Sequence, residues 1–295
     1  MQPTEDPAPR SRGDRAPEPT GAVESLDNRD RADLARDPEV MAVAPDMPTA
    51  VIAPFAVPEA EAATNAWGVE AVGAAETALT GAGSKVAVLD TGIDADHPAF
   101  AGVSITEEDF SGSGNGDRNG HGTHCAGTVF GRDVDGTRIG VARGVTNALI
   151  GKVLGDDGSG GSEMIFQAIS WASEQGADVI SMSLGFDFPG LVKRLVDQGY
   201  PADFATSLAL EAYRDNLRMF DALMDVISAR AAFSPGTLVV AAAGNESKRD
   251  VDPNYELAAS LPAAADGVIS VAAVADDPEG YQVADFSNTF ATISG

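Results

Sequence analysis

The chain has 295 residues, 44% of them hydrophobic, and 45 acidic against 19 basic side chains give it a formal net charge of −26. This balance argues against nucleic acid or anionic lipid as a partner, because both need a positive protein face that displaces counterions from phosphates. The longest apolar stretches, such as residues 238–243, fall far short of the ~20 residues of a membrane helix, so we expect no membrane span.

The first 60 residues are predicted to form a disordered, acidic and proline-rich arm. Residues 1–40 contain six prolines and only four large aliphatic side chains, too few to offset the entropy of ordering. Prolines 45, 48, 54 and 58 then divide short apolar runs, which is compatible with extended segments and not with a helix. Residues 61–295 are predicted to form one compact domain.

The compact part alternates apolar runs of strand type with helical patterns. One helix is predicted over residues 163–175, with Ser162 as its N-cap, and a longer one over about 204–231, where apolar residues recur every three or four positions. Strands are predicted at 86–89, 148–154, 178–183, 237–242 and 268–274. This alternation predicts an α/β fold: a mainly parallel sheet with helices on both faces.

Three segments carry residues with chemical potential. Asp90 follows a predicted buried strand and could orient an imidazole, although an Asp before a Gly turn is also a common turn former. His121 lies between glycines, and a neutral imidazole is the natural proton acceptor near pH 7. Asn245 ends a strand of small residues, where its amide could donate to a developing oxyanion or simply form a turn.

A zinc site is the minor alternative for the histidines. His121 and His124 are three residues apart, but zinc needs a third ligand. The remaining histidine, His97, precedes Pro98 in a predicted loop, and there is no His-Glu-x-x-His pattern. Cys125 is the only cysteine, so an internal disulfide is excluded and we expect it to serve as packing.

Read together, the three segments resemble the subtilisin-like serine protease family. The resemblance rests on Val-Leu-Asp-Thr-Gly-Ile-Asp around Asp90, His-Gly-Thr-His-Cys-Ala-Gly-Thr from His121, and Ala-Ala-Ala-Gly-Asn up to Asn245. It implies a serine endopeptidase in which His121 is the general base, Asp90 fixes its tautomer and Asn245 donates to the oxyanion. It also implies a peptide or protein substrate, a monomer, and no cofactor required for catalysis.

The resemblance further implies where a substrate would bind. Two extended edges would hold the peptide between them as an added strand, and a third segment would form the floor of an open, apolar pocket for the side chain before the scissile bond. The edges correspond to Gly158, Ser159, Gly160 and to Ser183, Leu184, Gly185, and the floor to Ala242, Ala243 and Gly244.

The sequence departs from the family in the segment that should carry the nucleophile. No Gly-Thr-Ser-Met-Ala motif follows Asn245, so we expect a fold that is incomplete at its C-terminus and a chain without its catalytic serine. A non-catalytic, peptide-binding pseudoprotease is the alternative function. Ala99 stands where many relatives have a calcium-binding Asp, which leaves a structural calcium unsupported and the metal sites unknown.

Three further expectations concern the rest of the chain. Residues 37–46 resemble the closing strand of the family's inhibitory propeptide and are interpreted as a remnant of it. Residues 186–235 exceed what a compact member of the family needs and are predicted to form an insertion. The family favours export, whereas no signal peptide is visible, so the cytoplasm stays open as the compartment.

Overall fold

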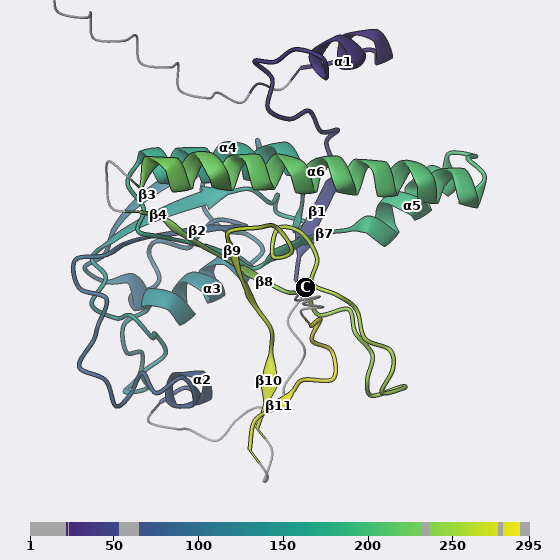
Figure 1. Cartoon of the computed structure of the whole chain (residues 1–295). Helices are drawn as coiled ribbons and strands as arrows, with labels where there is room; N and C mark the ends of the chain where they lie inside the picture. The colour runs from purple at the N-terminus through teal and green to yellow at the C-terminus, as the bar shows by residue number, and fades with distance from the viewer. Residues whose placement is uncertain (1–21, 23, 53–64, 232–235, 277–279, 290–295) are drawn as a thin grey trace, which may run out of the picture.

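The structure, a computed structural model, describes residues 22, 24–52, 65–231, 236–276 and 280–289. Its centre is a six-stranded sheet in the order β3-β4-β2-β6-β8-β9, and every pair of neighbours is parallel (Figure 1). This confirms the predicted α/β fold. The strands are β2 (Lys85–Asp90), β3 (Ser104–Asp109), β4 (Asn147–Lys152), β6 (Val179–Met182), β8 (Leu238–Ala242) and β9 (Val268–Val271).

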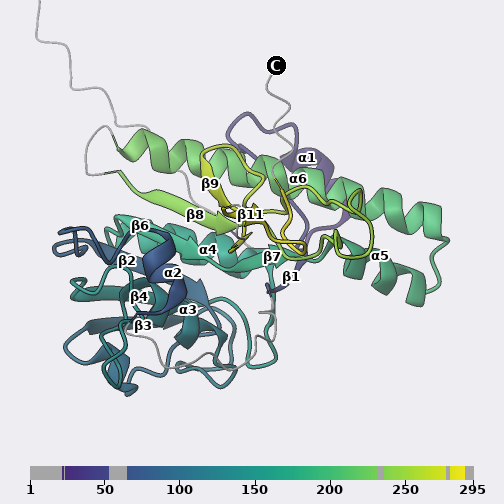
Figure 2. The same cartoon turned by 90° about the horizontal axis from the view of Figure 1, so that it is seen from below.

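Helices cover both faces of this sheet. Helices α4 (Ser162–Glu174) and α6 (Ala202–Arg230) lie on one face, and α3 (His121–Phe130) lies on the other (Figures 1 and 2). The short α2 (Trp67–Ala71) lies on the α3 side. No helix within the described ranges is both long enough and apolar enough to cross a bilayer.

Strand β2 shows how the sequence builds two cores from one strand. Its side chains alternate between the two faces, as strand geometry requires. Ala87 and Leu89 join the core cluster under α4 and α6, whereas Val86 and Val88 join the cluster that contains Phe130 of α3. Because both faces are buried, the strand is a continuous apolar run that delivers its last residue into a tightly packed environment.

The five predicted strands and two predicted helices are present, with shifted ends. The helix predicted from Ser162 begins at that residue, but its N-cap is Gly161, and Asp46 from the N-terminal arm supplies the capping carboxylate. Strands β5 (Ser159–Gly161) and β7 (Leu184–Phe186) lie where the two extended edges were predicted, whereas three other short elements were not predicted: η1 (Pro98–Phe100), β10 (Val274–Ala275) and β11 (Gln282–Val283). Strand β3 was also missed, because its sequence Ser-Ile-Thr-Glu-Glu-Asp is mostly polar, as suits an edge strand.

The structure differs from the expected disordered arm over residues 24–52. Helix α1 (Asn28–Leu34) begins with a capping box formed by Asp27 and Asp30. Strand β1 (Pro48–Val51) pairs antiparallel with β5 on one side and β7 on the other. The arm is ordered because it borrows hydrogen bonds and core contacts from the domain, which its own composition could not show. The other residues of the predicted arm, 1–21, 23 and 53–60, lie outside the described residues.

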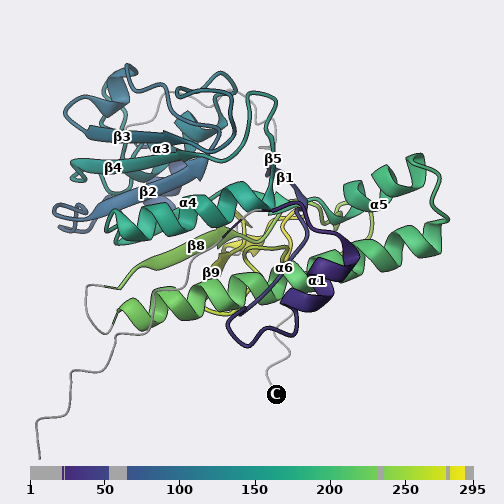
Figure 3. The same cartoon turned by 90° about the horizontal axis from the view of Figure 1, so that it is seen from above.

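The predicted insertion forms a helical pair. Helix α5 (Phe188–Asp197) and the first half of α6 lie side by side and project from the body (Figures 1 and 3). Arg31 of α1 forms ion pairs with Asp215 at 2.6 Å and Glu211 at 3.2 Å, which fastens the arm to α6. Helix α6 therefore contacts both the core of the domain and the arm.

The replacement Phe220→Ala tests the role of α6 in the core. Phe220 is fully buried, and its ring lies 4.5 Å from that of Phe166 and 5.7 Å from that of Phe186. We expect urea unfolding to show a loss of about 3–5 kcal/mol in the free energy of unfolding. The control Phe204→Ala, on the same helix but 62% exposed, should change it by less than about 0.5 kcal/mol. Equal losses in both variants would contradict this packing.

Candidate active site

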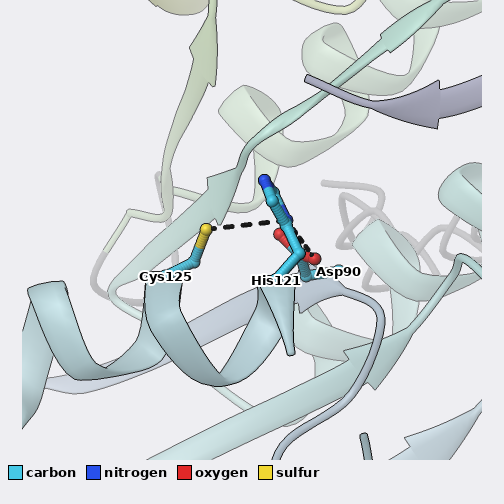
Figure 4. A group of neighbouring side chains, drawn as sticks. All are labelled: Asp90, His121 and Cys125. Carbon is cyan, nitrogen blue, oxygen red and sulfur yellow. Dashed lines mark hydrogen bonds and ion pairs between the residues drawn. The ribbon is translucent and has the colours of Figure 1, made fainter. Parts of the chain in front are cut away.

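Asp90 is the last residue of β2 and is fully buried. Its backbone oxygen accepts hydrogen bonds from the amides of Val153 and Leu154, which fixes the strand end. Its Oδ1 accepts from the Thr91 amide at 2.7 Å and lies 2.7 Å from Nδ1 of His121 (Figure 4). Its Oδ2 is buried and has no hydrogen-bond partner among the described residues. The imidazole is thus the main positive partner of this carboxylate.

His121 is the first residue of α3, and its ring lies between three groups. Nδ1 faces Asp90, and Sγ of Cys125, one turn along the helix, lies 3.8 Å from the same nitrogen (Figure 4). Nε2 lies 3.3 Å from the backbone oxygen of Ile52. Since the carboxylate can only accept, Nδ1 carries a proton, and a protonated ring donates from both nitrogens, one bond to Asp90 and one to Ile52.

The surroundings of His121 favour its charged form. Burial of the ring lowers the pKa, but the hydrogen bonds and charges of Asp90 and Cys125 outweigh burial and raise the pKa of His121 from 6.5 to about 10. The Asp90 carboxylate therefore stabilises an imidazolium, which is the state that a general base reaches once it has taken a proton.

Two glycines allow the strand end and the helix to meet. A Cβ on Gly122 would overlap the backbone oxygen of Gly92, and a Cβ on Gly92 would overlap the backbone oxygen of Gly116. Gly92 also has φ +104°, in the region that favours glycine. The turn after Asp90 can therefore press directly against the first turn of α3, which brings the carboxylate within reach of the imidazole.

The two predicted substrate edges enclose the chain's own strand β1. Thr49 pairs with Gly160 and Ala50 with Ser159 on one side, while Ala50 pairs with Gly185 and Val51 with Leu184 on the other. The amide of Val51 donates to the oxygen of Gly158 at 3.0 Å, and that of Ile52 donates to the oxygen of Ser183 at 3.2 Å. All six predicted edge residues thus border one extended segment that runs toward His121.

A cavity of about 270 Å³ lies beyond the end of this segment. His121 and Asn245 both line it, so the general-base candidate and the amide candidate share one space. Of the predicted floor residues, Ala242 and Gly244 line the cavity, whereas Ala243 is buried and does not. Sequence reasoning missed Ile52 and the segment after β9, whose small and apolar side chains carry no motif. The full lining is Ile52, His121, Cys125, Ser183, Ala242, Gly244, Asn245, Val271, Ala272 and Ala273.

The geometry does not support zinc bound by His121 and His124. His124 is exposed on α3. Within the described part of the chain, the ligand-type atoms that come together belong to Asp90, His121 and Cys125, and His124 is not among them. His97 accepts a hydrogen bond from the Ala99 amide through Nδ1 and so caps η1. It lies at a structural turn.

Comparison with known proteins places this geometry in a family. A family model described as the subtilase family matches residues 81–295. The chain belongs to the subtilase family. It is 36% identical over 219 residues to the major intracellular serine protease of Bacillus subtilis (strain 168). The aligned region covers 71% of this chain and 56% of that protein.

Two other relatives of this subtilase chain show the same pattern. It is 32% identical over 247 residues to subtilisin-like protease 6 of Trichophyton rubrum, covering 77% of this chain and 48% of that protein. It is 40% identical over 109 residues to thermitase of Thermoactinomyces vulgaris, covering 36% of this chain and 38% of that protein. The chain spans about half the length of the curated relatives that it matches over most of its residues.

The raised pKa of His121 predicts how stability depends on pH. The pKa of His121 is about 10 in the folded protein, against 6.5 for an ordinary histidine. The stabilisation that the charged ring gives the fold is therefore fully present below pH 6.5 and is lost as the pH rises toward 10. We expect urea unfolding to show a steeper fall in the free energy of unfolding over this window for the wild type than for His121→Gln. Parallel curves for the two proteins would contradict the Asp90–His121 coupling.

Proposed function

We propose that this subtilase chain carries the acid–base pair, the oxyanion donor and the peptide cleft of a serine endopeptidase. One observation supports this more than any other: an extended segment of the chain lies between β5 and β7 with the Ile52 carbonyl directed at Nε2 of His121. A peptide held in this way has a backbone carbonyl beside the imidazole and at the edge of the cavity that Asn245 also lines, which is where a scissile carbonyl would need to lie.

The proposed mechanism assigns one role to each side chain. In its neutral form His121 takes the proton of a serine hydroxyl at Nε2, because the hydrogen bond to Asp90 keeps the ring's own proton on Nδ1. The buried carboxylate stabilises the imidazolium until the ring returns the proton to the leaving amine. Asn245, which lines the same cavity, donates to the oxyanion. Removing such a donor costs about 10²–10³-fold in turnover, a magnitude set by subtilisin itself.

The nucleophile is the part of this machinery that the chain does not display. Among the described residues, the ring of His121 hydrogen-bonds to Asp90, Cys125 and Ile52, and to no serine. The 295 residues contain no Gly-Thr-Ser-Met-Ala motif. The proposal is therefore that these residues alone bind peptides and do not hydrolyse them by the triad route.

The occupied cleft also indicates the class of peptide that it accepts. Recognition runs through backbone hydrogen bonds from Val51 and Ile52, which any sequence can supply. Thr49 and Ile52 are buried, so small and β-branched side chains fit at these two positions. The proposed substrate is an extended peptide with an aliphatic residue next to the scissile bond.

The arm is proposed to act as an inhibitory segment. Strand β1 fills the cleft that a substrate would need, and Met47 is fully buried in the same core cluster as Phe220. Asp46 Oδ1 accepts from Ser162 Oγ at 3.1 Å and from the Glu163 amide at 3.2 Å at the start of α4, and Asn216 Nδ2 donates to the Pro45 oxygen at 2.8 Å. The proposed inhibitory contacts involve residues 45–52, which overlap the end of the 37–46 segment that resembles a propeptide strand.

Fluorophosphonate labelling of the gene product that contains these residues tests the protease assignment. We expect covalent labelling of a serine, and loss of that labelling in His121→Ala because the hydroxyl is then no longer deprotonated. The matched control is His124→Ala, an exposed histidine on the same helix, which should label like the wild type. Labelling that survives His121→Ala would overturn the role of His121.

The same experiment decides the alternative, a non-catalytic peptide-binding pseudoprotease. The peptide-like occupation of the cleft supports this alternative, because a peptide binder needs only the two backbone edges. A folded gene product that stays unlabelled, yet binds peptides in the cleft, would establish the pseudoprotease and reject the endopeptidase.

Release of the arm is predicted to expose the cleft. In Met47→Asp a charge replaces a fully buried methionine, which should undock β1 at a cost of several kcal/mol. Fluorescence anisotropy with a labelled peptide of residues 46–52 should then show a Kd at least about tenfold lower than for the wild type, because more of the protein is competent to bind. The control Met41→Asp, where the methionine is 60% exposed on the same arm, should leave the Kd unchanged.

A further inference from the structure

Asp117 lies in the loop between β3 and α3, four residues before His121, and its half-buried carboxylate collects five hydrogen bonds. Oδ1 accepts from the Thr91 hydroxyl at 2.9 Å, from the Asn119 amide at 3.0 Å and from the Gly120 amide at 2.9 Å. Oδ2 accepts from the amide of Thr123 at 2.9 Å and from its hydroxyl at 2.6 Å. Asp117 thus contacts both the turn after Asp90 and the start of α3.

The helix that carries His121 depends on this carboxylate for its cap. The first amides of a helix have no partner within the helix and need an acceptor from elsewhere. The N-cap residue of α3 is Gly120, which has no side chain to supply one. Asp117 supplies it to the Thr123 amide from outside the helix, and so fixes the first turn, where His121 lies.

Thr91 completes a continuous connection between the two catalytic candidates. Its amide donates to Asp90 Oδ1, and its hydroxyl donates to Asp117 and accepts from the Gly122 amide at 2.9 Å. Thr91 directly follows Asp90 in the chain, and Gly122 directly follows His121, so the bond between Thr91 and Gly122 links the two candidates through their neighbours. Thr91 is fully buried, so water cannot replace these bonds without opening the packing.

We propose that Asp117 is a positioning residue that holds the Asp90 turn and the first turn of α3 in the register that the Asp90–His121 hydrogen bond requires. This inference rests on the proposed function, since it concerns the same pair of side chains. Asp117 does not contact His121 through any described hydrogen bond, so it acts through Thr91, Gly120 and Thr123.

The carboxylate is suited to this role because it stays ionised. Burial raises the pKa of Asp117, but the hydrogen bonds from Thr123, Gly120 and Thr91 outweigh burial and hold the pKa below its ordinary value. An acceptor without protons can satisfy all five donors at once. In Asp117→Asn one oxygen becomes an NH₂ group, so whichever way the amide is oriented, at least one backbone N–H loses its acceptor.

Proton and nitrogen NMR of the His121 ring in the complete 295-residue chain tests this inference without any need for catalysis. In the wild type we expect a downfield resonance for the Nδ1 proton shared with Asp90. In Asp117→Asn that resonance should weaken or disappear, and the pKa of His121 should fall because its bond to Asp90 is longer.

Three more variants separate positioning from charge and from general stability. Thr91→Val keeps the Asp117 charge but removes the bridging hydroxyl, and should have the same effect on the His121 ring, whereas Thr91→Ser should restore the wild-type spectrum. The matched control is Asp109→Asn, a turn carboxylate at the end of β3 that accepts from Ser111 and Gly114, and it should leave the His121 signals unchanged.

The outcomes are distinct. An unchanged Nδ1 resonance in folded Asp117→Asn overturns the inference, and so does an unchanged resonance in folded Thr91→Val, since the proposed connection to the Asp90 turn passes through that hydroxyl. Should Asp117→Asn fail to fold, the Thr91 pair decides the matter. A gene product that fluorophosphonate does not label would remove the protease assignment while the NMR result still stood.

Discussion

The hydrogen bond between Asp90 and His121 is the interaction on which the rest of the structure depends. It joins the end of the central strand β2 to the first turn of α3 at 2.7 Å. Bringing two backbones this close requires glycines at 92 and 122, a buried run on both faces of β2, and a helix whose cap comes from another residue. The two glycines, the doubly buried strand and the externally capped helix all contribute to this one short hydrogen bond.

The domain has a second organising feature, which is a cleft lined by two backbone edges. Strand edges with unpaired amides and carbonyls attract any extended chain. Here β5 and β7 accept the protein's own β1, and the arm is held further by Asp46, Met47 and Arg31. The segment in the cleft, residues 47–52, is short and contains Pro48, and most of the rest of the arm is polar. Order in the arm therefore comes from its contacts with the domain and not from the arm itself.

Sequence reasoning predicted the sheet and brought together the segments of Asp90, His121 and Asn245 as a candidate site, because each left a local signal. The apolar run of β2 ends in an acidic residue, and the segment from His121 combines two histidines with small residues. Around β1, sequence reasoning indicated only extended segments and not a strand paired with the domain, since four residues containing a proline give no strand signal until two partner edges are present. It also missed Asp117 as a positioning residue, because a carboxylate in a Gly-rich loop looks the same in sequence whether it faces water or five donors.

The attachment of β1 to the same chain as its cleft has a kinetic and thermodynamic consequence. A tethered ligand experiences an effective concentration of roughly millimolar order, which does not change when the protein is diluted. A free peptide of equal intrinsic affinity must therefore approach that concentration before it displaces β1. Occupancy of the cleft is set by the tether and its anchor on α6 rather than by the abundance of the protein, and cutting the tether would convert a permanent occupant into one that diffuses away.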